Sequence, residues 1–250
     1  MLNIHIGTMG WSYNFWKGGF YPEDLTQSEL LAYYSKKFNT VEADSTFYRI
    51  PREQTMLEWK KQTPSGFLFS LKFPQKITHI KMLRNADEET EVFLKRVELL
   101  GEKLGPLLLQ LPPNFIDEGF TFLRDFLRKL PNRYRYAVEI RNKAMLCPEL
   151  YGLLRENKAA LAWVDREFPY VTAERTGDFI YLRWEGDRKK VNGLLGKVEV
   201  NKTSNIEAWV ENLKQFVVSE TAVYGYFSKY YSGLPTADAQ QFLKFAEDQS

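Results

Sequence analysis

The chain has 250 residues, and its contents of 44% hydrophobic and 26% charged residues are ordinary for a globular protein. The formal net charge of +2 excludes a strong overall attraction to nucleic acid or to an anionic membrane surface. The single cysteine, Cys147, excludes an intrachain disulfide and suits a reducing compartment. No apolar run approaches the roughly 20 residues of a membrane span and no signal peptide is evident, so we expect a cytoplasmic protein with no membrane association.

Strand-like and helix-like segments alternate along the chain. Apolar strand patterns fall at residues 3–7, 40–43, 67–72, 107–111, 136–140, 160–164, 179–183 and 222–226. Apolar residues at helical spacing fall at 25–38, 51–61, 86–104, 118–130, 148–157, 203–218 and 237–246, and Thr203 or Ser204 is the expected cap of the 203–218 helix. We expect loops at 44–48, 73–84 and 230–235, and a polar loop or small hairpin at 185–201.

This alternation predicts the fold class. Strands that alternate with helices favour a parallel sheet. Eight such units in a chain of this length predict an α/β fold, a single (β/α)8 TIM-barrel-like domain over residues 1–250. The connection between the sixth and seventh strands has room only for an irregular segment. A doubly wound open sheet is the alternative, but Gly7-Thr8-Met9-Gly10 lacks the glycine spacing of a dinucleotide-binding turn.

Charged or amide residues follow most of the expected strands. In barrels of this kind the functional site lies at the carboxyl ends of the strands. One interpretation of these residues is a buried ion-pair network that fills the barrel mouth. For the whole set we favour a ligand site, because burying so many charges costs several kcal/mol per ion unless all are matched. The set consists of Glu42, Lys72, Gln110, Glu139, Arg141, Asp165 and Arg183.

Three of these residues are candidates for catalysis. Glu42 and Glu139 follow the second and fifth strands, so they could face one another across the mouth as an acid–base pair. Lys72 could form a Schiff base if it were desolvated. The favoured alternative is that Lys72 neutralises Glu42 or a ligand anion.

The two arginines of the set suit anion binding. Arg141 and Arg183 could hold a phosphate or carboxylate through paired hydrogen bonds. Alternatively, they are the ion-pair partners of Glu139 and Asp165.

Loop residues add further ligand-binding candidates. His79 lies in the 73–84 loop and could transfer a proton or bind an anion, or be a surface histidine. Trp11, Tyr13 and Tyr48 crowd the loops after the first two strands. Aromatic residues there could stack on a sugar or a base, or pack as core under a lid.

The metal-ligand content of the sequence is low. Two histidines and one cysteine argue against a zinc site. A Mg²⁺ ion on Glu42, Glu139 or Asp165 has no positive support. We therefore expect no metal and no cofactor.

Several motifs together resemble the YecE-like family, catalogued as domain of unknown function 72. The resemblance runs over nearly the whole chain and implies a TIM-barrel-like fold, but no assigned reaction. The motifs that carry it are Gly10-Trp11-Ser12-Tyr13 with Trp16 and Phe20-Tyr21-Pro22, Phe38-Asn39-Thr40-Val41-Glu42 with Ser45-Thr46-Phe47-Tyr48 and Pro51, Phe69-Ser70-Leu71-Lys72 with Ile77-Thr78-His79, Leu109-Gln110-Leu111-Pro112-Pro113 with Phe115, and Ala137-Val138-Glu139 with Arg141.

The chain departs from the family pattern mainly in its second half. Asn142 and Glu185 stand where the family usually has histidines, so chemistry that relies on those histidines is in doubt. The other departures are Asp44 in place of an asparagine, Met145 in place of a tryptophan, and Ser228-Lys229 in place of an asparagine pair.

Two function classes remain open at this stage. The first is an enzyme of hydrolase or isomerase type that binds a small anionic or polyhydroxy molecule, such as a phosphosugar, at the strand ends. The second is a non-catalytic module in which the aromatic loop and the lysines around His79 bind nucleic acid or protein. The near-neutral net charge disfavours general nucleic-acid binding. The sequence does not indicate an oligomeric state.

Overall fold

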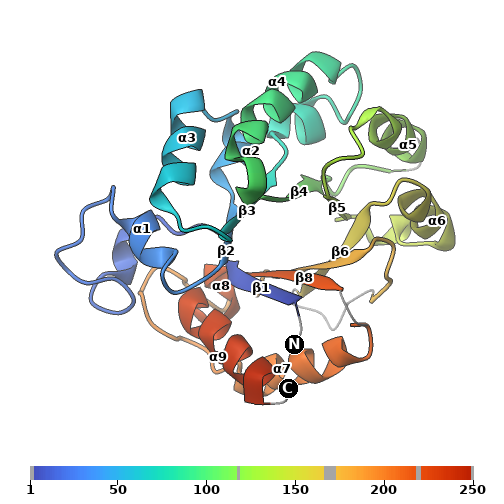
Figure 1. Ribbon diagram of the computed structural model, residues 1–250. Helices are drawn as coiled ribbons and strands as arrows, with labels where there is room; N and C mark the ends of the chain where they lie inside the picture. Colours follow the sequence, from blue (N-terminus) through green and yellow to red (C-terminus); the bar gives the residue numbers. More distant parts are fainter. Residues whose placement is uncertain (1–2, 117–118, 166–172, 218–220, 249–250) are drawn as a thin grey trace. The chain divides into compact units, whose positions relative to one another are not determined.

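A computed structural model describes residues 3–116, 119–165, 173–217 and 221–248 (Figure 1). Strands and helices alternate along the described chain, and each strand pairing given below is parallel. The chain divides into two compact units. Unit 1 comprises the described residues up to Glu42, residues 164–165, and those from Phe179 onward; unit 2 comprises the described residues 43–163 and 173–178. The expectation that residues 1–250 form one domain stays a prediction.

Unit 1 is organised around strand β8. Residues Asn3 to Thr8 of β1 pair with Ala222 to Phe227 on one side of β8, and the residues of β7 pair with the same stretch on the other side. The elements are β1 (Asn3–Thr8), η1 (Asn14–Trp16), α1 (Leu30–Tyr34), most of β2 (Thr40–Ala43), the end of β6, β7 (Phe179–Trp184), α7 (Thr203–Lys214), β8 (Ala222–Phe227), α8 (Lys229–Ser232) and α9 (Pro235–Asp248).

The strands of unit 1 are covered on both faces. Every residue of β7 and β8 is buried, which explains their nearly continuous apolar sequences. Helices α7 and α9 pack against each other, and α9 packs against β1 (Figure 1). The rings of Trp184 and Phe227 stack with their centroids 4.0 Å apart. A Cβ atom on Gly225 would lie 2.6 Å from the Trp184 ring, so this packing requires glycine.

Unit 2 carries strands β3 to β6 with helices along them. Its register pairs Leu71 with Leu107, Gln110 with Glu139, and Ala137 with Ala160. The elements are α2 (Ser45–Tyr48), α3 (Glu53–Gln62), β3 (Leu68–Lys72), the π-helical turn η2 (Lys76–Ile80), α4 (Asp87–Val97), η3 (Glu98–Lys103), β4 (Leu104–Gln110), α5 (Gly119–Lys129), β5 (Tyr136–Glu139), η4 (Lys143–Met145), α6 (Pro148–Glu156) and most of β6 (Ala160–Asp165).

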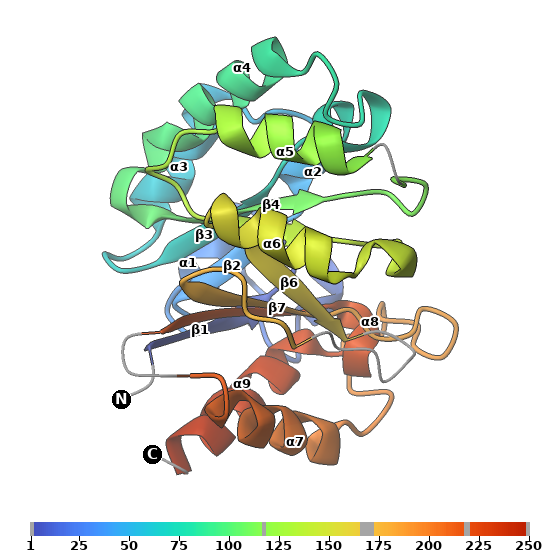
Figure 2. The ribbon, with the colours of Figure 1, turned by 90° about the vertical axis from the view of Figure 1, so that its right-hand side faces the viewer.

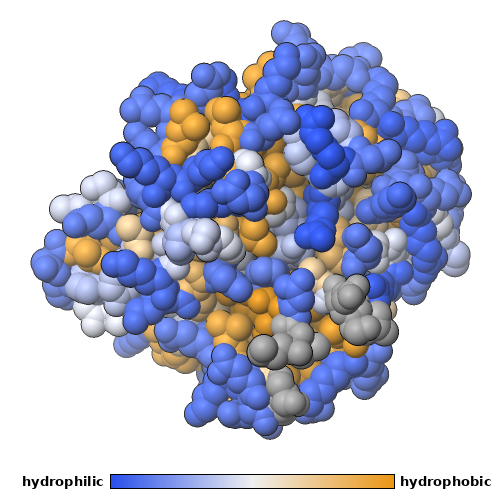
Figure 3. Space-filling model, viewed as in Figure 1, coloured by the Kyte–Doolittle hydropathy of each residue, from blue (hydrophilic) through white to orange (hydrophobic). Residues whose placement is uncertain are grey.

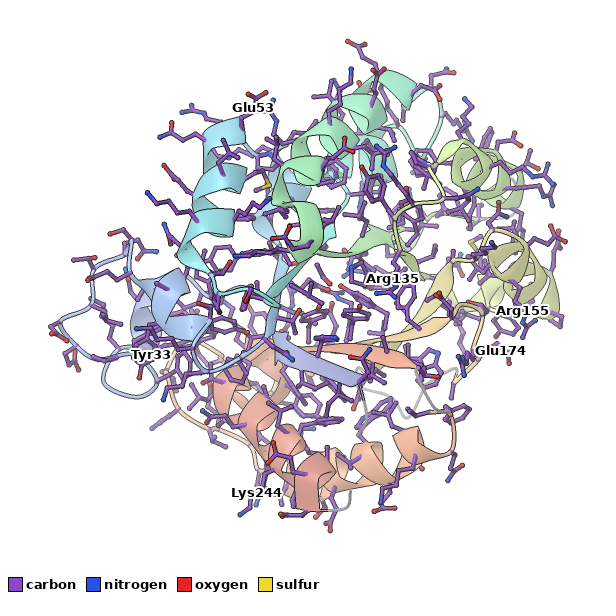
Figure 4. All side chains as sticks on the ribbon, in the orientation of Figure 1. Tyr33, Glu53, Arg135, Arg155, Glu174 and Lys244 are labelled. Carbon is purple, nitrogen blue, oxygen red and sulfur yellow. The ribbon has the colours of Figure 1, made fainter. Side chains whose placement is uncertain are left out.

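The strands of unit 2 share one direction. In Figure 2, β4 and β6 run from left to right, so their carboxyl ends lie at the right-hand side. The segment before β7 returns along α6, where Arg155 and Glu174 form an ion pair and point toward one another (Figure 4). Part of the irregular connection expected between the sixth and seventh strands falls on residues 166–172, which lie outside the described residues.

Three expected loops or helices differ from the structure. The helix expected over 25–38 is confined to α1; just ahead of it, the Glu29 carboxylate accepts hydrogen bonds from the N–H and hydroxyl of Thr26, as in a capping box. Residues Ser45–Tyr48 are helical rather than a loop. The loop expected at 230–235 contains the end of α8 and the start of α9.

The expected helix over 86–104 also ends early. Helix α4 stops at Val97, and a 3-10 segment follows in which Gly101 has a φ of +60°. Gly105 and Pro106, which directly follow the expected helix, both lie inside β4. The cap expected at Thr203 or Ser204 is wrong as well. The cap position of α7 is Lys202, and the Asn201 side chain accepts a hydrogen bond from the Thr203 N–H.

Candidate functional site

Three neighbouring strands of unit 2 end in polar side chains that contact one another. Lys72, Gln110 and Glu139 are the last residues of β3, β4 and β5. The register places Gln110 directly opposite Glu139, so their side chains stand at one level of the sheet. Gln110 Nε2 donates to Glu139 Oε2 at 2.9 Å, and Lys72 Nζ donates to Gln110 Oε1 at 3.3 Å. The structure therefore brings these three predicted site residues together.

Arg141 completes this row of polar groups. Its Nε donates to Glu139 Oε1 at 3.1 Å, so each carboxylate oxygen of Glu139 accepts a hydrogen bond from a different residue. Glu139 is fully buried, whereas 24% of the Arg141 side chain is exposed. A buried carboxylate of this kind is stable only while its partners remain in place. Arg141 links the buried row to the surface.

Lys72 is held by three different groups. Asp44 Oδ1 lies 3.1 Å from the ammonium, and the Phe47 ring centroid lies 4.8 Å from it. The Gln110 amide oxygen is the third contact. The ammonium therefore contacts a carboxylate, an amide oxygen and a ring face. This environment supports the role of Lys72 as a charge partner.

His79 lies in the π-helical turn η2, within reach of the same charges. Burial, and then the positive charges of Arg141 and Lys72, lower the pKa of His79, while Glu139 acts in the opposite direction. The ring stands edge-on to Phe47, with centroids 4.9 Å apart. The net effect of this environment favours the neutral form of the His79 ring. We call Asp44, Lys72, His79, Gln110, Glu139 and Arg141 the Glu139 cluster.

One hydrogen bond joins His79 to its neighbour Thr78. Thr78 Oγ1 lies 2.9 Å from His79 Nδ1, and it also lies 3.3 Å from the carbonyl oxygen of Pro74. The tautomer of the ring decides which atom of the Thr78–His79 pair donates the proton.

The two lysines on either side of His79 are both paired with one carboxylate. Glu89 lies 2.9 Å from the Lys76 ammonium and 2.6 Å from that of Lys81. These contacts, led by Lys81, lower the pKa of Glu89 to about 2. Because Glu89 offsets part of their charge, this loop gives no support to the nucleic-acid-binding alternative.

Tyr48 is the exposed aromatic residue beside the Glu139 cluster. It is 72% exposed at the end of α2, and its ring stands at 85° to that of Phe47, with centroids 5.3 Å apart. Phe47 in turn contacts Lys72 and His79. Tyr48 is thus placed where a ligand at this cluster could meet it.

A second polar cluster closes the strand ends of unit 1. The Arg183 guanidinium donates to Glu42 through Nη2 at 2.8 Å and Nε at 3.0 Å, and the Tyr181 hydroxyl donates to Glu42 Oε2 at 2.7 Å. Arg183 also forms an ion pair with Glu185. Glu42 is fully buried and Arg183 is 2% exposed. We call these four residues the Glu42 cluster.

Sequence reasoning missed two members of the Glu42 cluster. Tyr181 lies two residues before Arg183 on β7, and this spacing places both on one face of the strand. Burial, and then the Glu42 charge, raise the pKa of Tyr181 well above its usual value, so its hydroxyl remains a donor. Glu185, which replaces a family histidine, supplies a second anionic partner to Arg183.

The remaining predicted residues have partners outside both clusters. Asp165 accepts a hydrogen bond at 2.7 Å from the indole N–H of Trp209 on α7, and burial raises its pKa. Tyr13 donates to the Met9 carbonyl oxygen and packs 4.8 Å from the Trp16 ring. The backbone oxygen of Trp11 accepts from Tyr21 at 2.6 Å.

The aromatic loop of unit 1 is partly core. Trp16 is fully buried and Tyr21 is 1% exposed, so these rings pack inward and are not available for stacking. The Lys229 ammonium lies 5.3 Å from the Tyr13 ring centroid and 5.5 Å from that of Phe15. Ligand stacking on Trp11 or Tyr13 stays a prediction.

In the described part of the chain, no group of three or more histidine, cysteine, aspartate or glutamate side chains is arranged to hold a metal ion. Within the same residues, no helix is both long and apolar enough to cross a membrane. The expectations of no cofactor and of a cytoplasmic location stay predictions.

The arrangement of elements defines the class of protein. The described residues form eight strands that alternate with helices, in an α/β TIM-barrel-like fold. The solved structure of a DUF72 family protein from Thermotoga maritima matches 98% of this chain and 99% of its own, with a TM-score of 0.83 and 27% sequence identity. The predicted fold class is thereby confirmed.

The family follows from the sequence match. A family model described as "Protein of unknown function DUF72" matches residues 5–250, and the chain belongs to this family. The chain is 35% identical over 139 residues to UPF0759 protein YecE of Escherichia coli (strain K12), a match that covers 56% of this chain and 48% of that protein. It is 30% identical over 169 residues to UPF0759 protein YunF of Bacillus subtilis (strain 168), covering 64% and 58%. The chain spans about half the length of the curated relatives it matches. The resemblance to the YecE-like family is confirmed.

Proposed function

We propose that this protein is an enzyme that binds a small anionic or polyhydroxy molecule, such as a phosphosugar, at the Glu139 cluster and performs acid–base chemistry on it. The observation that carries the proposal is that a partly exposed arginine, a buried carboxylate and a histidine are brought together at one set of strand ends. Strand ends of this kind are where barrel enzymes hold their reacting groups.

Arg141 is the ligand-binding group in this proposal. It is the cationic member of the row that solvent reaches, and Glu139 fixes the direction of its guanidinium through Nε. A guanidinium binds phosphate or carboxylate oxygens through paired, charge-assisted hydrogen bonds. A sugar ring attached to the anionic group could rest against the exposed Tyr48.

His79 is the proton acceptor in this proposal. The charges of Arg141 and Lys72 hold its pKa down, and Glu139 favours its protonated form. An anion bound to Arg141 offsets one of the opposing charges. Ligand binding therefore raises the pKa of His79 and makes it a stronger base when a substrate is present.

The remaining candidates support these groups. Lys72 lies between Asp44 and Gln110, and the Gln110 amide donates a hydrogen bond to Glu139. Glu42, the other predicted catalytic carboxylate, is bound by Tyr181 and Arg183 within unit 1. Its joint action with Glu139 stays a prediction.

A thermal-shift screen with a charge-matched control tests ligand binding. We expect a sugar phosphate to stabilise the wild-type protein; a ligand at 100 times its Kd contributes about 2.7 kcal/mol. For a chain of this size, that raises the Tm by about 5–10 °C. Arg141→Gln should abolish the shift, and Arg128→Gln, on the exposed face of α5, should retain it.

Turnover is then measured with any ligand that the screen identifies. We expect Glu139→Gln and His79→Gln to lose turnover, with His79→Gln keeping most of the binding. A ligand whose shift is equal in Arg141→Gln and Arg128→Gln would place its site elsewhere and contradict the proposal.

A further inference from the structure

A polar pocket lies at the opposite end of the unit 2 strands from the Glu139 cluster. Its volume is about 430 Å³, within the size range of small-molecule sites. It is formed where the chain enters β4, β5 and β6, and Asp178 closes it from the segment before β7. Figure 3, in the orientation of Figure 1, shows hydrophilic residues over much of the surface that faces the viewer.

The lining of this pocket is predominantly cationic. Arg133, Arg135 and Lys158 contribute three positive charges, against one negative charge from Asp178. Arg133 also pairs with Glu98 at 3.0 Å, but 60% and 53% of these side chains are exposed, and exposed pairs are weak and exchangeable. Arg135 stands at the entry to β5 (Figure 4). Both arginines stay charged at every physiological pH.

Lys158 occupies a backbone position that normally favours glycine. It follows α6 with a φ of +53°, in the left-handed region. Its N–H donates to the Arg155 carbonyl oxygen at 3.1 Å, and the next N–H, of Ala159, donates to the Leu154 carbonyl oxygen at 2.9 Å. Glycine is the usual residue just after a helix, because a side chain strains this conformation. A lysine there therefore costs stability while adding a third cation to the pocket.

We propose that this pocket binds the phosphate group of a small phosphorylated metabolite, as a site separate from the Glu139 cluster. Arginine and lysine side chains bind the oxygens of a phosphate monoester through charge-assisted hydrogen bonds. The lysine at a glycine-favoured position is explained by this role. The single carboxylate of Asp178 offsets one of these positive charges and so limits the affinity.

Two substitutions test the proposal in opposite directions. Binding is measured by titration calorimetry at fixed ionic strength with inorganic phosphate, glucose 6-phosphate and AMP. The order of their affinities shows whether the pocket prefers free phosphate, a sugar phosphate or a nucleotide. Lys158→Gly should weaken binding by about fivefold, as expected for one partly exposed ion contact. Because it also relieves the backbone strain, it should not lower the Tm. Asp178→Asn should tighten binding by a similar factor.

Matched variants separate this site from general electrostatics and from the proposed active site. Lys158→Arg should keep the affinity, and Lys36→Gln, which removes an exposed charge from unit 1, should leave it unchanged. Arg141→Gln should also leave it unchanged, so the two proposals can fail independently. Equal losses in Lys158→Gly and Lys36→Gln, no binding of any of the three probes, or loss of binding in Arg141→Gln would overturn the inference.

Discussion

Replacing Asp238 by asparagine should stabilise the protein at alkaline pH and have a much smaller effect in mild acid. Asp238 lies in the first turns of α9 and is 4% exposed. The hydroxyl of the fully buried Ser232 donates to its Oδ2 at 2.7 Å. Burial raises the pKa of Asp238 to about 7, against the weaker opposing effects of Ser232 and Lys202. Asparagine has the shape of the protonated carboxyl and can accept the same hydrogen bond.

The pKa difference sets the size of the effect. The folded protein holds the proton more tightly than the unfolded chain, whose aspartate pKa is 3.8. The contribution of Asp238 to stability is therefore complete below pH 3.8 and is lost as the pH rises to about 7. Each pKa unit corresponds to about 1.36 kcal/mol. Between pH 5 and pH 8 the wild type should lose about 3 kcal/mol that the Asp238→Asn variant retains.

Urea unfolding of both proteins at pH 5 and pH 8 measures this difference, because all other titrating groups are common to the two chains. The advantage of Asp238→Asn should grow by about 3 kcal/mol between the two pH values. Asp248→Asn, at an exposed position on the same helix, should show no such growth. An Asp238→Asn effect that is equal at pH 5 and pH 8 would refute the assigned pKa and its cause.

Three further predictions concern individual polar contacts and charges. Glu89→Gln should lower the Tm by about 1–3 °C at pH 7 and leave it unchanged near pH 2. The lowered pKa of Glu89 stabilises the folded protein above pH 4.5, and this stabilisation is lost as the pH falls toward 2. Equal Tm losses at both pH values would contradict this prediction. Tyr181→Phe should lower the free energy of unfolding, measured by urea titration, by about 1–3 kcal/mol, because the buried Glu42 carboxylate loses a hydrogen-bond donor. An unchanged free energy of unfolding would show that this hydrogen bond contributes nothing to stability. Arg141→Gln should raise the pKa of His79, because it removes one of the positive charges that lower this pKa. The pKa is measured by NMR titration, and a lower pKa in the variant would contradict the assigned effect of Arg141.

Strand ends were the most predictable part of the site. The apolar run Ala137-Val138 followed by Glu139, and similar runs before Lys72 and Gln110, predict polar groups at the carboxyl ends of parallel strands. The contact between Gln110 and Glu139 then depends on the strand register, which a sequence does not supply. Local composition can therefore identify the residues of a strand-end cluster but not the partner of each one.

The partners of Glu42 illustrate the same limit over a longer distance. Arg183 and Tyr181 are more than 130 residues away along the chain and bind Glu42 because of tertiary packing. The alternation along β7 places Tyr181 and Arg183 on one face, so Tyr181 could have been added to the candidate list. Glu185 was noted only as a departure from a family histidine, because nothing local shows that it faces Arg183.

The errors in secondary structure lie at the ends of helices. Glu29 accepts hydrogen bonds from Thr26 just ahead of α1, where the apolar spacing predicted continuous helix. The left-handed Gly101 interrupts the helical pattern before β4. Apolar periodicity predicts which face of a segment is buried, but it does not locate the residues at which a helix begins and ends.

The most direct test of the proposed active site uses the two histidines of the chain. His79 belongs to the Glu139 cluster, and His5, which stacks on Tyr224 in unit 1, serves as an internal reference. The imidazole signals are followed by NMR during titration with the phosphosugar that gives the largest thermal shift, and they are assigned with His79→Gln. The account predicts that the ligand raises the pKa of His79 and leaves that of His5 unchanged. A saturating ligand that leaves the pKa of His79 unchanged would contradict the assignment of this cluster as the active site.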